Sequence, residues 1–172
     1  MTLQEFKSNF NNQELPAEMQ LLFDFQDKFG AETYVAGFGL LQNDKSGLRY
    51  GWSDNSDFLN QLMPFAESGD GSMYCLWDNK THQPINQMPV VYFDSDGEGE
   101  NVIAKNFLEF IQILLIPDPY DDWRPENYAN FVHVFNEKMN LPIPNNFDDV
   151  AEAAAIADQA SFDTWKNQYV KN

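Results

Sequence analysis

The chain contains few basic residues. Of its 172 residues, 10 are Lys or Arg and 27 are Asp or Glu, and the formal net charge is −17. A polypeptide with this charge repels phosphate groups, so the sequence argues against nucleic acid and anionic membranes as partners. The same charge attracts and steers a basic protein. It also keeps a protein soluble without any partner, and composition alone does not choose between these two roles.

Cysteine and long apolar runs are equally scarce. The single cysteine, Cys75, cannot form an internal disulfide, so the fold does not depend on an oxidising compartment. Residues 1–16 contain no apolar core of signal-peptide length. The longest apolar stretch, around residues 110–116, is too short to cross a bilayer. We therefore expect a cytoplasmic protein.

Recognisable catalytic and cofactor motifs are missing. Cys75 falls in an apolar strand, where a buried and inert thiol is expected. The two histidines, His82 and His133, have no spacing that pairs them with a nucleophile, and with one cysteine they argue against zinc. Neither a Gly-x-Ser-x-Gly elbow nor a Gly-Lys-Ser/Thr phosphate loop occurs. The sequence predicts no catalytic residue, metal or cofactor. A catalytic site built from two carboxylates is left open as a possibility, because an acidic chain contains many pairs of Asp and Glu residues.

Aromatic and apolar residues are plentiful. They make up 15% and 43% of the chain, which is typical of a folded domain with one sizeable core. Periodicity and turn residues predict strands over 34–41, 48–52, 72–77 and 89–93, with another strand or helix start at 102. They predict helices over 2–11, 15–30, 55–62, about 107–116, 126–140, 148–158 and 161–170. Pro64 is expected to end the third of these helices, and Ser161 to cap the last.

Residues 65–111 carry the most information. Strand 72–77 is apolar on both faces, which places it in the middle of a sheet or under a helix. The Asp-Gly pair in the turn before it, Asp70-Gly71, favours a hairpin. The acidic turn 94–100 begins like a calcium-binding EF-hand loop, but Lys105 stands where that loop needs a bidentate glutamate. We therefore interpret the turn as solvated.

The acidic side chains between positions 94 and 126 are candidates for binding a partner. Nine acids stand there against two basic residues, Lys105 and Arg124. If the acidic loops share one edge they would meet a basic surface, whereas charges spread around the domain would only solvate it. Trp123 is the candidate aromatic anchor, because Trp is enriched at binding hot spots. The predicted partner-binding residues are Asp94, Asp96, Glu98, Glu100, Asp121, Asp122 and Trp123, with Asp70 in the neighbouring turn.

The order of these segments resembles the SUKH superfamily. The matching features are the helix 16–29, the turn 69–72, the strands 73–77 and 89–93, and the 102–111 segment. The resemblance is clearest over residues 65–111, and the C-terminal third is not part of it. It implies an α+β fold in which a bent, mostly antiparallel sheet packs against helices. Residues 1–116 would form this SUKH-like core, and residues 117–172 a helical C-terminal extension packed on the same domain.

The resemblance also implies a function. Members of the superfamily with an assigned role are generally protein-binding modules and not enzymes. The expected function is that of an immunity protein that binds and occludes a bacterial toxin, here a basic one. The alternatives are an intracellular regulatory scaffold, like the fungal members, and an acidic sugar-binding module or hydrolase. The identity of the partner, the binding face and the oligomeric state are left open.

Overall fold

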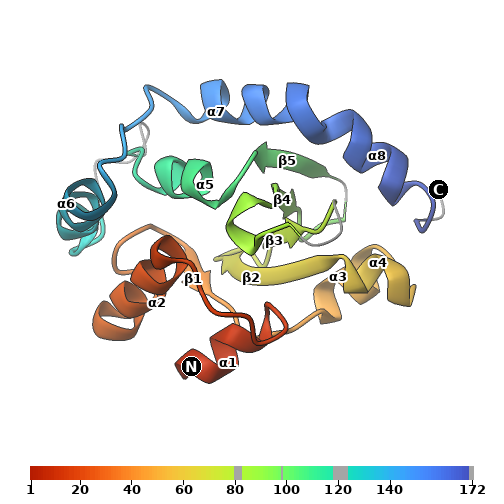
Figure 1. Ribbon diagram of the computed structural model, residues 1–172, viewed down its shortest axis with the longest axis horizontal. Helices are drawn as coiled ribbons and strands as arrows, with labels where there is room; N and C mark the ends of the chain where they lie inside the picture. The colour runs from red at the N-terminus through yellow and green to blue at the C-terminus, as the bar shows by residue number, and fades with distance from the viewer. Residues whose placement is uncertain (80–82, 98, 118–123, 171–172) are drawn as a thin grey trace.

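The computed structural model describes residues 1–79, 83–97, 99–117 and 124–170. Its centre is one antiparallel sheet in the order β1-β2-β3-β4-β5, with helices on both faces (Figure 1). The predicted α+β class is therefore confirmed. The strands are β1 Phe38–Leu40, β2 Leu62–Ser68, β3 Met73–Trp77, β4 Val90–Phe93 and β5 Glu100–Ala104.

Eight α-helices are assigned in the described residues. They are α1 Leu3–Ser8, α2 Ala17–Phe29, α3 Ser46–Gly51, α4 Ser56–Asn60, α5 Phe107–Leu114, α6 Tyr128–Met139, α7 Phe147–Ala154 and α8 Ala160–Lys166. A 3₁₀ turn, η1 Ile85–Gln87, precedes β4, and a π-helical segment, η2 Ala155–Gln159, joins α7 to α8. Side-chain caps fix several of the starts: the Asn55 and Asn106 side chains accept backbone N–H bonds in the first turns of α4 and α5.

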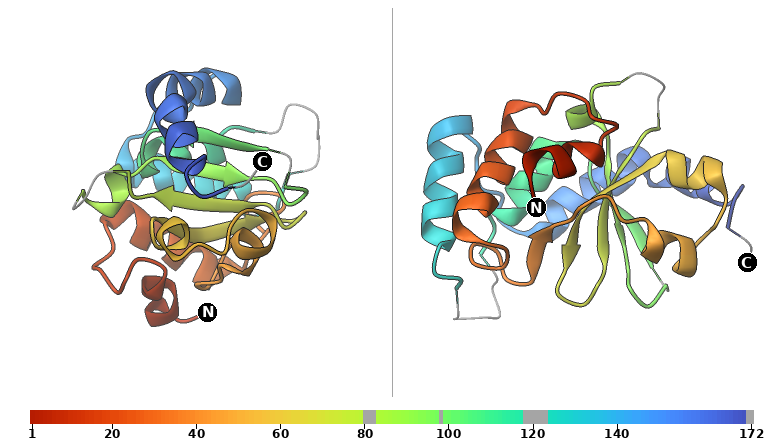
Figure 2. Two further views of the ribbon diagram at one scale, coloured as in Figure 1. Left: turned by 90° about the vertical axis from the view of Figure 1, so that its right-hand side faces the viewer. Right: turned by 90° about the horizontal axis from the view of Figure 1, so that it is seen from below.

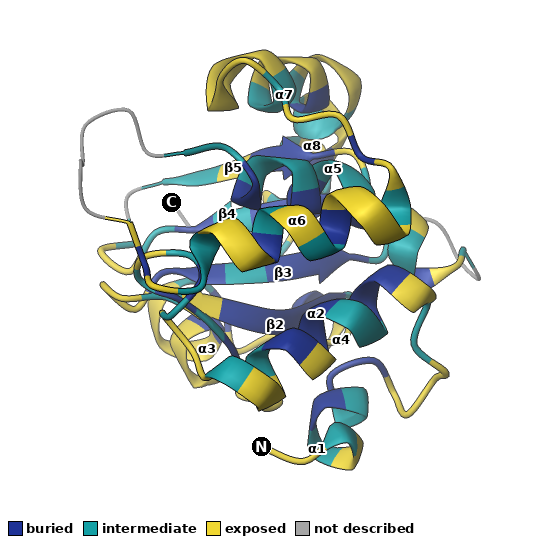
Figure 3. Ribbon diagram, turned by 90° about the vertical axis from the view of Figure 1, so that its left-hand side faces the viewer, coloured by how far each residue is buried: buried dark blue, intermediate teal, exposed yellow. Residues whose placement is uncertain are grey.

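One face of the sheet is covered by α1, α2, α5 and α6. Figure 3 shows α2 and α6 there, each with buried and exposed residues along its length. Phe65 and Leu76 from the sheet are buried with Phe107, Phe110 and Phe131 from the helices in the larger core.

The other face is covered by α3, α4 and α8. Along β3 the side chains alternate, so that Tyr74 and Leu76 face the first core while Cys75 and Trp77 face the second. Phe162 of α8 is fully buried in this second core and lies edge-on to Trp77, with 5.2 Å between ring centroids. Strand β3 therefore lies in the middle of the sheet with both faces covered, as its sequence predicts.

At each edge of the sheet, a glutamine side chain accepts one backbone N–H. On the β1 edge, the Gln26 Oε1 atom accepts the Leu40 backbone N–H at 2.8 Å. On the β5 edge, the Gln159 Oε1 atom accepts the Val102 backbone N–H at 2.7 Å. Figure 1 shows α7, η2 and α8 running on as one curved helical stretch along β5. One backbone donor at each edge is thereby occupied within the chain.

Three predicted elements differ from the structure. The predicted strand 48–52 is wrong: residues 46–51 form helix α3, which buries Leu48 and leaves Tyr50, two residues on, 90% exposed. The predicted strand 34–41 is reduced to β1, since the preceding residues form turns. The predicted cap at Ser161 is absent, because the alanine-rich chain stays helical from α7 into α8 without a break.

The expected stop at Pro64 is also wrong. Helix α4 ends before it, and Pro64 lies within β2. The β2–β3 register shifts between Pro64 and Ala66, and β1 pairs only with Ala66 to Ser68. A proline is tolerated at such an irregularity because its missing N–H is not needed for the ladder. The bulge also bends the strand.

Candidate functional site

Two hairpin turns lie together at one end of the sheet. The β2–β3 turn and the β4–β5 turn point the same way (Figure 2, right) because β3 and β4 are paired between them. Ser72, which is fully buried, accepts the Ser95 backbone N–H on its hydroxyl oxygen at 3.0 Å. This hydrogen bond ties the first turn to the second and fixes the spacing of their acidic residues.

Asp70 holds the first turn and presents a charge from it. Its carboxylate accepts the Ser68 hydroxyl and the Ser72 backbone N–H, the latter at 2.9 Å. The Ser68 hydroxyl and then the Ser72 amide lower the pKa of Asp70, because both hydrogen bonds favour the ionised carboxylate. The residue is exposed, so this carboxylate faces solvent as an anion at neutral pH.

Asp94 and Asp96 belong to the second turn. The Asp94 carboxylate accepts the Asp96 backbone N–H at 2.8 Å, and the Asp94 backbone N–H donates to the Gly99 carbonyl at 2.9 Å. Three of the residues predicted to bind a partner, Asp70, Asp94 and Asp96, therefore stand at the same end of the sheet. Within the described part of the chain, no group of three His, Cys, Asp or Glu residues is placed to hold a metal ion.

Glu100 is the other predicted partner-binding residue that the structure describes. Glu100 forms an ion pair with Lys166 of α8, and the two side chains are 12% and 15% exposed. Its carboxylate thus attaches the C-terminal helix to β5, and its use by a partner stays a prediction. The remaining four, Glu98, Asp121, Asp122 and Trp123, lie outside the described residues.

An exposed aromatic residue stands beside the acidic turns. Tyr50 is 90% exposed, and the carbonyl oxygen of the next residue, Gly51, lies against Gly97 of the second turn. Sequence reasoning missed Tyr50 because a strand over 48–52 would place Leu48, Tyr50 and Trp52 on one face. In helix α3, Leu48 is buried and Tyr50 is exposed. Reading residues 46–51 with helical spacing would have placed these two residues on different faces and so identified Tyr50.

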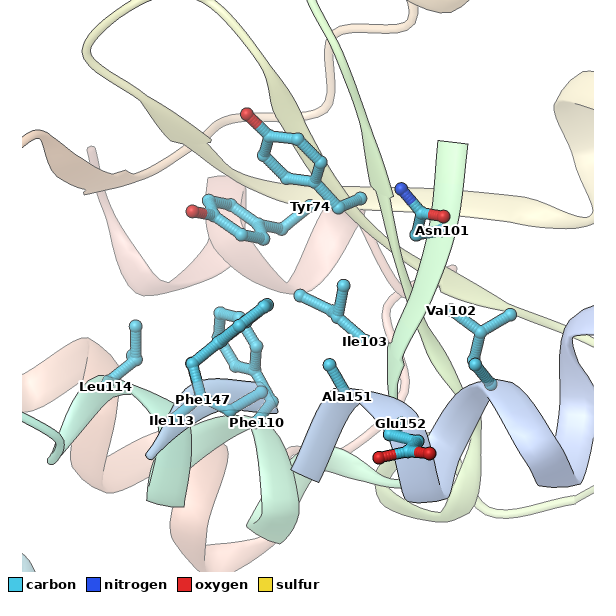
Figure 4. Close-up of a pocket in the computed structure, with 12 residues that line it drawn as sticks. Tyr74, Asn101, Val102, Ile103, Phe110, Ile113, Leu114, Phe147, Ala151 and Glu152 are labelled. Carbon is cyan, nitrogen blue, oxygen red and sulfur yellow. The ribbon is translucent and has the colours of Figure 1, made fainter. Parts of the chain in front are cut away.

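A pocket of about 530 Å³ opens on the side of the sheet that carries α5. Ile103 of β5 and Phe110 and Ile113 of α5 are among its apolar lining residues, and α7 supplies Phe147 and Ala151 (Figure 4). This volume is in the range of ligand-binding pockets, which are mostly apolar with a few polar groups.

The polar groups of the pocket come from the strands and from α7. Tyr74 and Tyr92 lie on neighbouring strands, with ring centroids 5.3 Å apart, and Asn101 pairs with Tyr92 in the register. Burial raises the pKa of Tyr74 to about 12, and the nearby Tyr92 and Asp70 add to the rise. Glu152 is the one carboxylate among the lining residues, all of which the structure describes.

Cys75, which the sequence predicts to be inert, and Trp77 belong to the core. Cys75 is fully buried, and burial raises its thiol pKa, as expected of an inert cysteine. Trp77 is 3% exposed and packs on Phe162. Across the ranges the structure describes, no helix has the length and apolar character needed to cross a membrane.

The fold is that of an α+β domain in which a five-stranded antiparallel sheet is enclosed by helices. Residues 2–113, more than half of the chain, match the SMI1 / KNR4 family (SUKH-1), so the chain belongs to this family. The match ends inside α5 and leaves out α6, α7 and α8. No curated protein and no solved structure matches the chain. Membership of this family is consistent with a role in toxin immunity or in regulation, carried out by binding another protein.

Proposed function

We propose that this chain is an immunity protein that binds a basic toxin domain in the cytoplasm and blocks it by occlusion, without catalysing a reaction. Membership of the SUKH-1 family supports a protein-binding role. The observation that carries the proposal is the hydrogen bond from Ser95 to Ser72, which gathers Asp70, Asp94 and Asp96 at one sheet end. A fixed group of anions suits a basic partner, because complementary charge accelerates encounter and suppresses wrong partners.

The mechanism needs only surface contact. The acidic turns steer the toxin and orient it, and Tyr50 supplies apolar contact area beside them. An enzyme that cleaves sugars would instead need two carboxylates flanking a cleft, and the pocket beside β5 has Glu152 alone among its lining residues. The same acidic surface disfavours nucleic acid and anionic membranes.

The test begins by finding the partner. Pull-down from the source cell, repeated at high salt, identifies proteins held by charge, and a toxin encoded beside this chain is the expected one. The triple variant D70N/D94N/D96N is then compared with a control, D27N/E126Q/E137Q, that removes the same charge from exposed positions on α2, before α6 and on α6.

Steering by the turns predicts that the triple variant associates about tenfold more slowly at low ionic strength while the control stays close to wild type. Asparagine keeps the acceptor oxygens of the turns, so the triple variant should remain folded under the conditions of the assay. Equal association rates for the two variants, measured by stopped flow, would contradict the proposal. Toxin protection that survives both variants would refute it.

A further inference from the structure

We infer that the pocket between β5, α5 and α7 is an anchor site for the protein partner, and that it takes a bulky apolar side chain flanked by a basic residue. This inference rests on the proposed function and adds to it a second contact region. The occupant is identified by three features of the pocket: its lining, its charge and its position.

The lining selects an apolar group. Ile103, Phe110 and Ile113 contribute apolar surface, and Phe147 at the start of α7 is 43% exposed although it is a large aromatic residue. Large exposed apolar surfaces of this kind mark interaction sites. A volume of about 530 Å³ accommodates one large side chain of a partner with its neighbours.

The charge selects a cation beside that group. None of the lining residues is Lys, Arg or His, and Glu152 supplies an exposed carboxylate on the α7 side. An anionic ligand would have to leave water without a counter-charge, which is costly. A basic residue next to the apolar anchor would instead pair with Glu152 on the α7 side of the pocket, opposite the strand side that carries Tyr74 (Figure 4).

The position connects the pocket with the acidic turns. Tyr74 lines the pocket one residue after Met73, where β3 begins, and the Asp70 charge acts on its phenol. Tyr92 and Asn101 are paired in the β4–β5 ladder, one position from the pair Phe93–Glu100 that borders the second turn. One partner can therefore contact the turns and fill the pocket together.

The pocket also assigns a role to the C-terminal helices. Its strand residues and Phe110 and Ile113 of α5 fall inside the family match, whereas Phe147, Ala151 and Glu152 of α7 lie well beyond residue 113. Helix α7 thus adds a wall to a surface that the family domain supplies. A wall outside the shared domain is suited to setting which partner is accepted.

The probes are two synthetic peptides, acetyl-Gly-Lys-Leu-Trp-Lys-Gly-amide and its counterpart with glutamate in place of both lysines, each titrated into the ¹⁵N-labelled full chain. The lysine peptide should shift the backbone amides of Asn101, Ile103 and Ala151. The glutamate peptide should bind about tenfold more weakly or not at all.

Two variants on α7 locate the site. Ala151 lines the pocket and Ala153 is exposed outside it, so A151W fills the pocket while A153W adds the same side chain nearby. A151W should weaken the lysine peptide at least tenfold and A153W should not. If A151W does not fold, E152K tests the charge alone and should weaken the same peptide about tenfold.

Several results would overturn the inference. These are shifts outside the pocket, equal binding of the two peptides, or full binding by A151W and E152K. Binding of the neutral dye N-phenyl-1-naphthylamine without binding of the lysine peptide would identify a site for small apolar molecules instead. With the toxin in hand, an A151W variant that protects fully while D70N/D94N/D96N does not would reject the pocket and keep the acidic turns.

Discussion

Replacement of Phe162 by alanine tests whether the C-terminal helices belong to the same folding unit as the sheet. We propose that they do, because Phe162 of α8 is fully buried against strand residues of the second core. Its ring centroid lies 5.2 Å from that of Trp77 and 6.0 Å from that of Phe93, and 5.5 Å from that of Trp165 in its own helix. The substitution therefore removes a side chain that touches both the sheet and α8.

The expected loss follows from burial. Deleting a fully buried phenylalanine side chain costs about 3–5 kcal/mol of unfolding free energy. In a domain of this size that loss lowers the melting temperature by roughly 6–20 °C. The matched control is Phe147→Ala, which removes the same group from a position that is 43% exposed and should cost much less.

Urea unfolding provides the assay. Tryptophan fluorescence comes from four residues, of which Trp52, Trp77 and Trp165 lie in or against the second core, and far-ultraviolet circular dichroism reports all helices. For a single cooperative unit, the two signals coincide in wild type and both move to lower urea in F162A. Separate transitions, or a loss in F162A no larger than in F147A, would refute the view that residues 117–172 pack as part of one domain.

Two further predictions concern the sheet edge and the first acidic turn. Gln159→Leu should leave the Val102 amide without its acceptor, lower the free energy of unfolding by about 1–3 kcal/mol and speed hydrogen exchange at Val102. Gln159→Glu keeps an acceptor and is the control. Unchanged exchange at Val102 in the leucine variant would contradict this. For Asp70, the folded pKa lies below the unfolded value of 3.8, so its stabilisation is present above pH 3.8 and is lost as pH falls through the folded pKa. The difference in melting temperature between wild type and Asp70→Asn should shrink below pH 3.8, and a constant difference would disprove this linkage.

The elements that sequence predicted well are those whose signals are local. Helix α2 ends at Gly30 as expected, and β3 and β4 appear where apolar residues follow turn residues. The elements that sequence missed depend on distant partners. Strand β2 contains Pro64, which is tolerated because the register with β3 shifts there and β1 pairs only with later residues of the strand. Helix α3 is short, and its Leu48 points into a core completed by α8.

The candidate site divides in the same way. The acidic residues of the two turns are visible in the sequence, but that Asp70 and Asp94 share a surface depends on the β3–β4 pairing. Glu100 looks like its neighbours in sequence, yet its position at the start of β5 brings it to Lys166, 66 positions along the chain. The pocket could not be predicted, because α5 and α7 meet β5 only through the tertiary fold.

The two glutamines that each accept a backbone N–H at a sheet edge make one way of attaching another chain less favourable. Strand addition, in which a peptide extends a sheet through main-chain hydrogen bonds, needs a free row of backbone groups. Here Leu40 and Val102 already donate to Gln26 and Gln159 within the described chain. A partner that added a strand at either edge would have to displace one of these glutamines, so recognition through side chains and shape is favoured. Such recognition discriminates between sequences far better than a backbone ladder that any polypeptide can extend.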